Sequence, residues 1–471
     1  MQNDPSSEPS ANEVSRTVRR FEEMLATHAA VFFDLSDFEL LIDHYTGRQE
    51  FDQALRACET ALAQYPFSAE LLIDKSQVLA MLGRTADALR LINEVAEREP
   101  DNADVAVTRG IVYSQRGDFA RAVEYFKQGL EQSGPGADRD DVQFNLGLAY
   151  QHWGKPRAAA RHYQAALRIN AANEAATQEL LQCWALADEL AQAPTFFQEF
   201  VDADPFSAQA WLNLGLAHLR LENTDAAHDA FEYATLTGLH FYSAYNYLGQ
   251  TRVLRDDFRG ALEAFEQSFP AGHPTTEALC NLGECHEKLR EWADAKRYYQ
   301  RALEMDQQVD EAWFGLGMVL AGQQRYYEAL HYIHKALSLY DESGEYWLGL
   351  AQCEYQVGNV VSALEAYERA TTADPASAAA WVGWASVLFE QGHYEEAADL
   401  VKAALEADPE DADLHYRACA YLIAAGRYRA AYQYLENALL LDFERHPVLF
   451  EYFPTLASQP TLLRLIDQYR K

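Results

Sequence analysis

The sequence is poor in basic residues. Only 38 of its 471 residues are Lys or Arg, and eight of these are Lys, against 72 Asp or Glu, so the formal net charge is −34. Proteins that bind nucleic acids or anionic lipids need clustered cations that displace counterions or face a negative surface. The charge balance therefore argues against nucleic acid and membrane surfaces as partners.

The sequence also lacks long apolar runs and paired cysteines. No run approaches eighteen apolar residues, so no membrane-spanning helix is predicted. The first thirteen residues, MQNDPSSEPSANE, have neither a basic start nor an apolar core, and we expect residues 1–13 to be a disordered tail rather than a secretory signal. The six cysteines contain no C-x-x-C pair, which is typical of reduced thiols and predicts a cytoplasmic location.

Internal repetition is the dominant feature of the sequence. With 49% hydrophobic residues the chain is expected to fold, and one alanine recurs every 34 residues. A single interval of 37 residues follows Ala122, which places a three-residue insertion in the turn-forming stretch near 133–137. The series comprises Ala54, Ala88, Ala122, Ala159, Ala193, Ala227, Ala261, Ala295, Ala329, Ala363, Ala397 and Ala431.

Small and bulky residues recur in phase with these alanines. A glycine such as Gly110 or Gly147 precedes the alanine, and a bulky residue such as Phe126 or Tyr163 follows four positions after it. Apolar residues have helical spacing, with a break near the middle of each unit. Each unit is therefore predicted to be two helices joined by a tight turn, with small residues where the two backbones approach closely.

This pattern resembles the tetratricopeptide repeat (TPR) family. The resemblance implies an all-α fold, a right-handed α-solenoid of about twelve 34-residue helix-turn-helix units with terminal capping helices. The ending FEYFPTLASQPTLLRLIDQYRK is also similar to the ends of uncharacterised bacterial TPR proteins. One unit shows the family pattern in Trp347, Leu350, Ala351, Gly358, Ala363, Tyr367, Ala370 and Pro375.

The register gives the expected organisation of the chain. A capping helix is expected over 14–34, twelve repeats over 35–445 and capping helices over 446–471. The units Ala69–Asn102 and Glu174–Ser207 depart from the pattern, and we expect them to pack less regularly.

No catalytic or metal motif stands out. Cys280 and Cys285 are five residues apart, which places the two sulfurs roughly 140° apart around a helix, so they do not suit one zinc ion. Gly154-Lys155-Pro156 has proline where a phosphate loop needs Ser or Thr. We therefore expect a protein that is not an enzyme and that has no catalytic residues, metal site or cofactor.

The candidate binding site follows from the family resemblance. In TPR proteins, positions 2, 5, 9 and 12 of each first helix face a concave groove, which here is both apolar and acidic. Asn145, Asn213 and Asn281 match the asparagine of a family clamp for terminal carboxylates, but its lysine is missing. The expected groove residues are Val107, Ile111, Phe144, Leu148, Leu212, Leu216, Leu219, Asn246, Gln250, Glu277, Glu284, Glu287, Glu311, Phe314, Met318, Tyr355 and Phe389.

The expected function is a noncatalytic scaffold or adaptor that binds a protein or peptide segment in this groove. Carboxylates such as Glu284 and Glu311 favour a partner with basic and apolar side chains. A chaperone-like assembly factor for an unfolded client and a sensor of small ligands or peptides are the alternatives. The sequence leaves homo-oligomerisation and the use of the convex face open.

Overall fold

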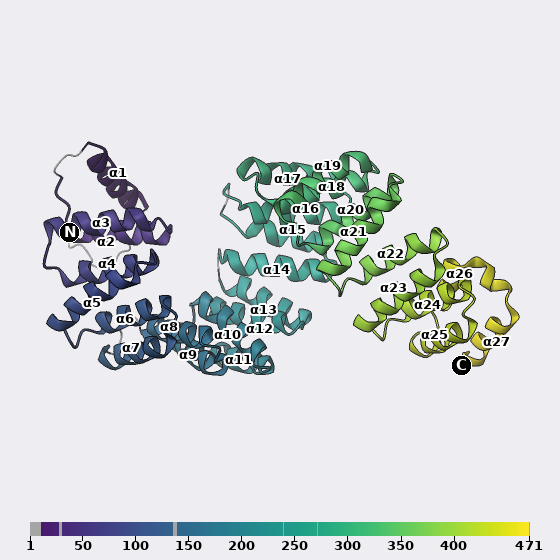
Figure 1. The fold of residues 1–471 in the computed structure, drawn as a ribbon, viewed down its shortest axis with the longest axis horizontal. Coiled ribbons are helices and arrows are strands. Elements are labelled where there is room, and N and C mark those ends of the chain that lie inside the picture. The colour runs from purple at the N-terminus through teal and green to yellow at the C-terminus, as the bar shows by residue number, and fades with distance from the viewer. Residues whose placement is uncertain (1–10, 28–30, 135–138, 239, 271, 471) are drawn as a thin grey trace. The chain divides into compact units, whose positions relative to one another are not determined.

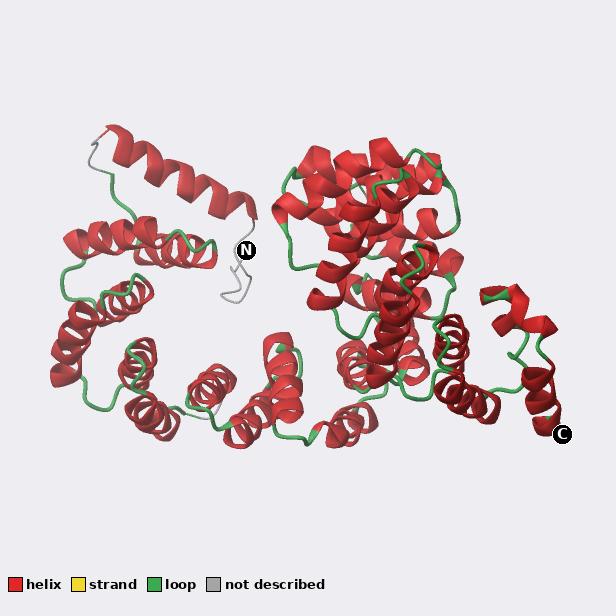
Figure 2. Ribbon diagram, turned by 45° about the vertical axis from the view of Figure 1, so that its right-hand side comes forward, coloured by secondary structure: helices red, strands yellow, loops and turns green. Residues whose placement is uncertain are grey.

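The computed structural model describes residues 11–27, 31–134, 139–238, 240–270 and 272–470. All regular structure within these ranges is helical, as Figure 2 shows. The chain divides into two compact units, Met1–Gly238 and Leu239–Lys471. Each unit contains six consecutive pairs of antiparallel helices, which confirms the predicted all-α solenoid of about twelve repeats (Figure 1).

The first unit begins with one helix outside the repeats, followed by six helix pairs. Its helices are α1 (Ala11–Thr27), α2 (Leu35–Gly47), α3 (Phe51–Gln64), α4 (Ala69–Met81), α5 (Thr85–Arg98), α6 (Ala103–Gln115), α7 (Phe119–Gln132), α8 (Arg139–His152), α9 (Pro156–Ile169), α10 (Glu174–Leu186), the 3₁₀ helix η1 (Leu190–Gln192), α11 (Ala193–Ala203), α12 (Ala208–Arg220) and α13 (Thr224–Thr237).

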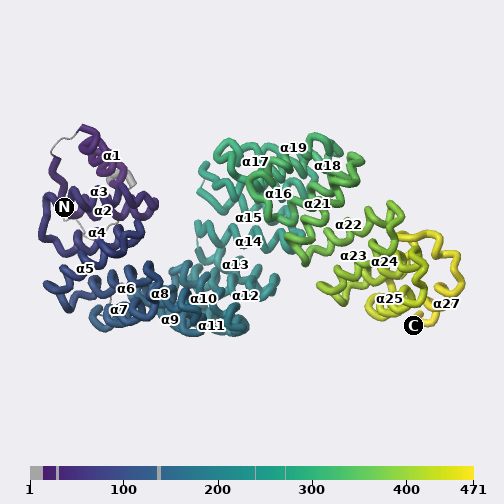
Figure 3. Tube along the Cα trace, in the orientation of Figure 1, coloured from purple at the N-terminus to yellow at the C-terminus, as the bar shows by residue number. Residues whose placement is uncertain are grey.

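The second unit contains six further pairs and ends in three short helices. Its helices are α14 (Tyr242–Leu254), α15 (Phe258–Gln267), α16 (Thr276–Lys288), α17 (Trp292–Met305), α18 (Asp310–Gly322), α19 (Tyr326–Leu339), α20 (Gly344–Gln356), α21 (Val360–Ala373), α22 (Ala378–Glu390), α23 (Tyr394–Ala407), α24 (Ala412–Ala424), α25 (Tyr428–Leu441), α26 (Val448–Tyr452), the 3₁₀ helix η2 (Pro454–Ser458) and α27 (Pro460–Tyr469). Figure 3 follows the helix-turn-helix path through each unit.

The residue that ends one repeat often caps the first helix of the next. Ser68 accepts a hydrogen bond from the Leu71 amide at 3.3 Å, and Asn173 accepts one from Ala176 at 2.9 Å. Such caps satisfy amide groups that have no partner within the helix. The 34-residue period thus fixes both the helix boundaries and their capping residues.

The periodic alanines lie where the two helices of a repeat meet. All twelve are fully buried. A Cβ atom on Gly110 would lie 2.6 Å from the Phe126 ring, and one on Gly147 would lie 2.4 Å from the Tyr163 ring. The prediction that small residues lie where two helix backbones approach closely is therefore confirmed, because a larger residue at either glycine would collide with an aromatic ring of the second helix.

One of the two irregular repeats departs from the common geometry. In the repeat Glu174–Ser207, the 3₁₀ helix η1 replaces the usual start of the second helix, and α11 is 11 residues long where most second helices have 14. In the repeat Ala69–Asn102, α4 and α5 have the usual lengths of 13 and 14 residues. The departure from the repeat pattern therefore leaves helix length unchanged there, and less regular packing of this repeat stays a prediction.

A further irregular repeat was not predicted. Helix α15 has only 10 residues and ends before Pro270. Proline lacks the amide donor and disfavours a helical residue before it, so Pro270 accounts for the early end.

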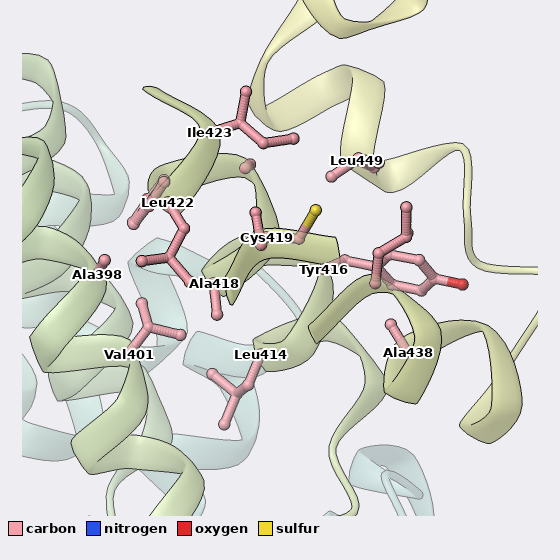
Figure 4. Packing of buried hydrophobic residues seen from close by; sticks show 14 of the residues in the cluster. Ala398, Val401, Leu414, Tyr416, Ala418, Cys419, Leu422, Ile423, Ala438 and Leu449 are labelled. Carbon is pink, nitrogen blue, oxygen red and sulfur yellow. The ribbon is translucent and has the colours of Figure 1, made fainter. Parts of the chain in front are cut away.

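Helices outside the repeats cover the apolar ends of the array. Helix α1 begins at Ala11, so residues 11–13 are helical, where a tail was expected; residues 1–10 lie outside the described range. Phe21 of α1 is fully buried against Phe33. At the other end, Leu449 of α26 is fully buried and lies beside Tyr416 and Cys419 of α24 (Figure 4).

Candidate functional site

A cavity of about 460 Å³ lies among the first helices α16, α18 and α20 of the second unit. We call it the acidic pocket. Five of its lining residues are carboxylates and one is a lysine. Its lining comprises Cys280, Asn281, Glu284, Glu287, Lys288, Tyr299, Asp310, Glu311, Phe314, Gly315, Met318, Tyr340, Ser343, Glu345 and Tyr346.

Aromatic rings form the apolar part of the acidic pocket. The rings of Phe314 and Tyr346 stack with centroids 4.5 Å apart, and both residues are buried. The Tyr346 hydroxyl donates a hydrogen bond to Asp310 Oδ2 at 2.9 Å, and the Tyr299 hydroxyl donates one to Glu287 Oε2 at 3.3 Å. The rings are thus held in fixed positions before any ligand binds.

Among the described residues, no Lys, Arg or His forms a salt bridge with the pocket carboxylates, although Lys288 partly offsets the burial that raises the pKa of Glu287 and Glu345. Salt bridges of the surrounding described residues join other groups, such as His286 with Glu291 and Arg325 with Glu328. Lys288 lines the cavity and is an exposed residue. Five carboxylates against one lysine leave a strongly negative cavity, and a partly buried negative charge without a partner is unfavourable.

Raised pKa values show that the ionised forms of three pocket carboxylates are unfavourable. Burial raises the pKa of Glu287 to about 7; Lys288 and the Tyr299 hydrogen bond oppose this rise, while Glu284 and Glu345 add to it. Burial is also the main cause of the raised pKa of Glu311, followed by the neighbouring carboxylates. The raised pKa of Glu345 has the same main cause, with Glu284 adding to it. A cation entering the pocket would favour the ionised forms.

Nucleophilic and metal chemistry have little support here. Burial raises the pKa values of Cys280 and Cys285 to about 12, so both thiols stay protonated near neutral pH. In the described part of the chain, no group of three or more His, Cys, Asp or Glu side chains is arranged to hold a metal ion. The pocket carboxylates are suited to noncovalent recognition of a positive group.

Five of the predicted groove residues meet at the acidic pocket, namely Glu284, Glu287, Glu311, Phe314 and Met318. Phe314 is only 8% exposed and belongs to the core between α18 and α20, so it shapes the pocket floor. Phe314 is therefore largely a core residue that also lines the pocket, and its contact with a partner stays a prediction.

The predicted apolar groove residues of the first unit lie at the edge of the core. Leu212 is 1% exposed and therefore cannot contact a partner in this conformation, which corrects that expectation. The others are half-buried, and most of them pack against buried clusters. They are Val107, Ile111, Phe144, Leu148, Leu216 and Leu219.

The remaining predicted residues lie elsewhere in the second unit. Asn246 donates a hydrogen bond to Glu277 Oε1 at 3.1 Å, and Gln250 is half-buried on the same helix, α14. The Tyr355 hydroxyl donates to the Glu390 carboxylate. Phe389 stacks on Tyr421 and contacts the Phe453 ring.

The C-terminal segment therefore covers part of the predicted groove. Phe453 follows α26, and its ring lies 5.9 Å from that of Phe389 in an edge-to-face arrangement. The ring of Tyr452, in α26 itself, lies 4.0 Å below the Arg417 guanidinium. Phe389 is thus a half-buried residue with contacts inside the chain, and its role as a partner contact stays a prediction.

Some pocket residues were missed from the sequence. Glu345 occupies position 2 of its repeat, the same position as Glu277 and Glu311, so the register could have identified it. Tyr299 comes from a second helix, α17, and Tyr346 from position 3 of α20. The groove positions alone do not include either tyrosine.

Comparisons with known proteins identify the family. Tetratricopeptide repeat models match residues 45–109, 101–172, 189–238 and 212–274. The model of the C-terminal domain of cilia and flagella-associated protein 70, also a TPR model, matches residues 245–458. The chain is a tetratricopeptide repeat protein. The likeness of its ending to bacterial TPR proteins stays a prediction.

Curated and solved relatives of this TPR protein are distant. A stretch of 152 residues, 31% of the chain, is 26% identical to human aspartyl/asparaginyl beta-hydroxylase, and the match spans about a fifth of the length of that protein. The crystal structure of the APC/C hetero-tetramer Cut9-Hcn1 matches 90% of this chain and 99% of its own at 15% identity, with a TM-score of 0.44. YrrB, described as a TPR protein with an unusual peptide-binding site, matches 39% of this chain and 95% of its own chain at 22% identity, with a TM-score of 0.30.

TPR folds generally serve as noncatalytic scaffolds for protein contacts, and the architecture of this chain is consistent with that role. No helix among the described residues is both long and apolar enough to cross a bilayer.

Proposed function

We propose that this protein is a noncatalytic scaffold whose acidic pocket binds a basic side chain from an extended segment of a partner protein. The observation that carries the proposal is the set of five carboxylates that share one pocket with a single lysine and a stacked Phe314–Tyr346 pair, and that form no salt bridge with a described residue. A buried free thiol at each of the six cysteine positions fits a reducing compartment, and we place the protein in the cytoplasm.

The shape and chemistry of the pocket favour an arginine side chain. A guanidinium is planar, stacks on aromatic faces and donates several hydrogen bonds to carboxylates. Glu284, Glu287 and Glu345 supply acceptors, while Phe314 and Tyr346 supply the apolar floor. Met318 adds a flexible apolar contact for the neighbouring part of the segment.

The test compares the wild type with a Glu284→Lys, Glu311→Lys double variant. A labelled peptide of alternating Arg and Leu should bind the wild type saturably in fluorescence anisotropy. The double variant should bind it at least about tenfold more weakly, because two attractive contacts become repulsive. Affinity purification from lysate followed by mass spectrometry would then identify natural partners that the wild type retains and the variant loses.

A matched control carries the same charge change elsewhere in the unit. Glu304 of α17 and Glu365 of α21 are exposed and do not line the pocket, so a Glu304→Lys, Glu365→Lys variant should bind like the wild type. Equal loss of binding in both double variants would mean that only overall charge matters and would contradict the proposal. Phe314→Ala is unsuitable as a binding variant, because removing a buried aromatic ring destabilises the core.

A small cationic ligand is the second candidate, because the cavity volume lies within the roughly 300–1,000 Å³ typical of small-molecule sites. Arginine amide, used as a competitor, separates the two possibilities. If it binds as tightly as the peptide, the pocket is a small-ligand site and the flanking peptide contacts contribute nothing.

A further inference from the structure

Repeats three and four differ from the rest of the chain in charge. Residues 103–173 contain nine Lys or Arg and seven Asp or Glu, whereas the whole chain has 38 against 72. Residues 142–173 contain no Asp or Glu at all. This local excess of positive charge lies in the first unit, on helices α6 to α9, and is separate from the acidic pocket of the second unit.

Stacked aromatic rings lie between the cations of α6 and α7. The Tyr113 and Tyr125 rings stack with centroids 5.3 Å apart and an interplanar angle of 6°. The Arg109 guanidinium lies 5.4 Å from the Tyr125 ring, and the Arg121 guanidinium lies 5.5 Å from the Tyr113 ring. The order is therefore Arg109, Tyr125, Tyr113 and Arg121, with a cation on each side of the stacked ring pair.

A second stack continues this arrangement on α8 and in the turn that joins α8 to α9. The Lys127 amine of α7 lies 5.8 Å from the Tyr150 ring, which joins the two repeats. Tyr150 stacks on Trp153 with centroids 6.2 Å apart, and the Lys155 amine lies 3.2 Å above the Trp153 ring. We call the two stacks together the cationic strip.

Most cations of the strip are free of acidic partners. Arg109 donates to the neutral Asn93 side chain, at 2.7 Å from Nη2 to Oδ1, and Lys127 and Lys155 take part in no salt bridge with a described residue. Arg121 lies 3.5 Å from Asp118. Arg121, Lys127, Trp153 and Lys155 are exposed, and Trp153 is 39% accessible.

We propose that the cationic strip is a second interaction surface, which binds an acidic segment of a partner protein through carboxylates and apolar side chains. The aromatic faces hold the cations in place and lower the entropy lost when they pair with carboxylates. Charges beyond a Debye length of about 8 Å are largely screened at physiological salt, so the strip can attract a short acidic segment despite the net charge of −34. A nucleic acid would extend past the strip into strongly acidic repeats, which favours a peptide as the occupant.

The test uses a labelled peptide of alternating Glu and Phe in fluorescence anisotropy on the full-length protein. The wild type should bind it saturably, and added salt should weaken binding. A Lys127→Glu, Lys155→Glu variant should lose at least about tenfold in affinity. The control variant, Arg98→Glu, Arg220→Glu, has the same charge change at exposed residues of α5 and α12 and should bind like the wild type.

Several outcomes would overturn the proposal. Absence of binding to the wild type, or the same loss in the control variant, would exclude a specific surface. Tighter binding of an oligothymidylate than of the peptide would assign the strip to nucleic acid. Wild-type self-association in sedimentation equilibrium, abolished by the Lys127→Glu, Lys155→Glu change, would assign it to a second copy of the chain. Circular dichroism of all variants separates these results from unfolding.

Discussion

Replacing Glu287 by Gln should stabilise the second unit above neutral pH. Burial raises the pKa of Glu287 in the folded protein to about 7, from an ordinary value of 4.5. Above pH 7 both folded and unfolded states carry the ionised group, and the folded state holds it in an unfavourable environment. Gln keeps an acceptor for the Tyr299 hydroxyl but has no charge.

The magnitude follows from the difference between the two pKa values. Each pKa unit corresponds to about 1.4 kcal/mol, so the ionised Glu287 lowers the free energy of unfolding by at most about 3 kcal/mol at pH 8. Because the folded pKa is raised, this loss develops as pH rises from about 4.5 to 7, and it is under about 1 kcal/mol at pH 5. For a unit of this size the difference corresponds to a rise in Tm of roughly 5–10 °C at pH 8.

Thermal unfolding of the wild type and Glu287→Gln, followed by circular dichroism at pH 5 and pH 8, provides the assay. The stabilisation should be large at pH 8 and small at pH 5. Glu304→Gln, on the exposed face of α17, is the control and should shift the transition little at either pH. A Glu287→Gln variant that is equally stabilised at both pH values, or destabilised at pH 8, would refute the reasoning.

Two further predictions concern the repeat register. Ala329→Trp places a large ring at a fully buried helix contact, so overpacking should lower the free energy of unfolding by about 1–3 kcal/mol and lower Tm with it. Val361→Trp, at a residue 72% exposed, should leave Tm unchanged, and an unchanged Tm for Ala329→Trp would contradict the register. Gly358 and Gln324 occupy equivalent turn positions with φ of 88° and 63°, where a residue with a Cβ atom is strained. Gly358→Ala should therefore lower the free energy of unfolding, and Gln324→Gly should raise it, each by up to about 1 kcal/mol in urea titrations. The same sign for both changes would exclude backbone strain as the cause.

The fold could be predicted because every repeat uses the same contacts. Ala159 and Gly147 need only their own repeat to define a close helix contact, and the 34-residue period repeats that contact along the chain. Helices that depart from the usual length could be predicted only where the sequence contains a specific signal for the departure, such as a proline. Pro270 was such a signal and explains the short α15, although it is not part of the repeat pattern.

The acidic pocket could be predicted only in part. The groove positions of the TPR pattern include Glu284 and Glu311, since these residues lie on the same stripe of successive first helices. It could not show that Phe314 is covered by Tyr346, or that Phe453 from outside the repeats covers Phe389. Those contacts depend on side chains from neighbouring repeats or from the C-terminal segment, which a single-repeat pattern does not contain.

Folding alone does not account for the acidic pocket. Glu287 would stabilise the unit more as a neutral residue, yet the chain places it beside Glu284 and Glu345, and the nearby Lys288 offsets only part of the cost of its charge. In a protein with 72 acidic residues, carboxylates at fully exposed positions would supply solubility at no such cost. A bound guanidinium or ammonium would remove the repulsion, so part of the stability lost in the free protein becomes affinity for a cation. This coupling between an unfavourable charge and its missing partner is the physical argument for recognition of a basic segment at the pocket.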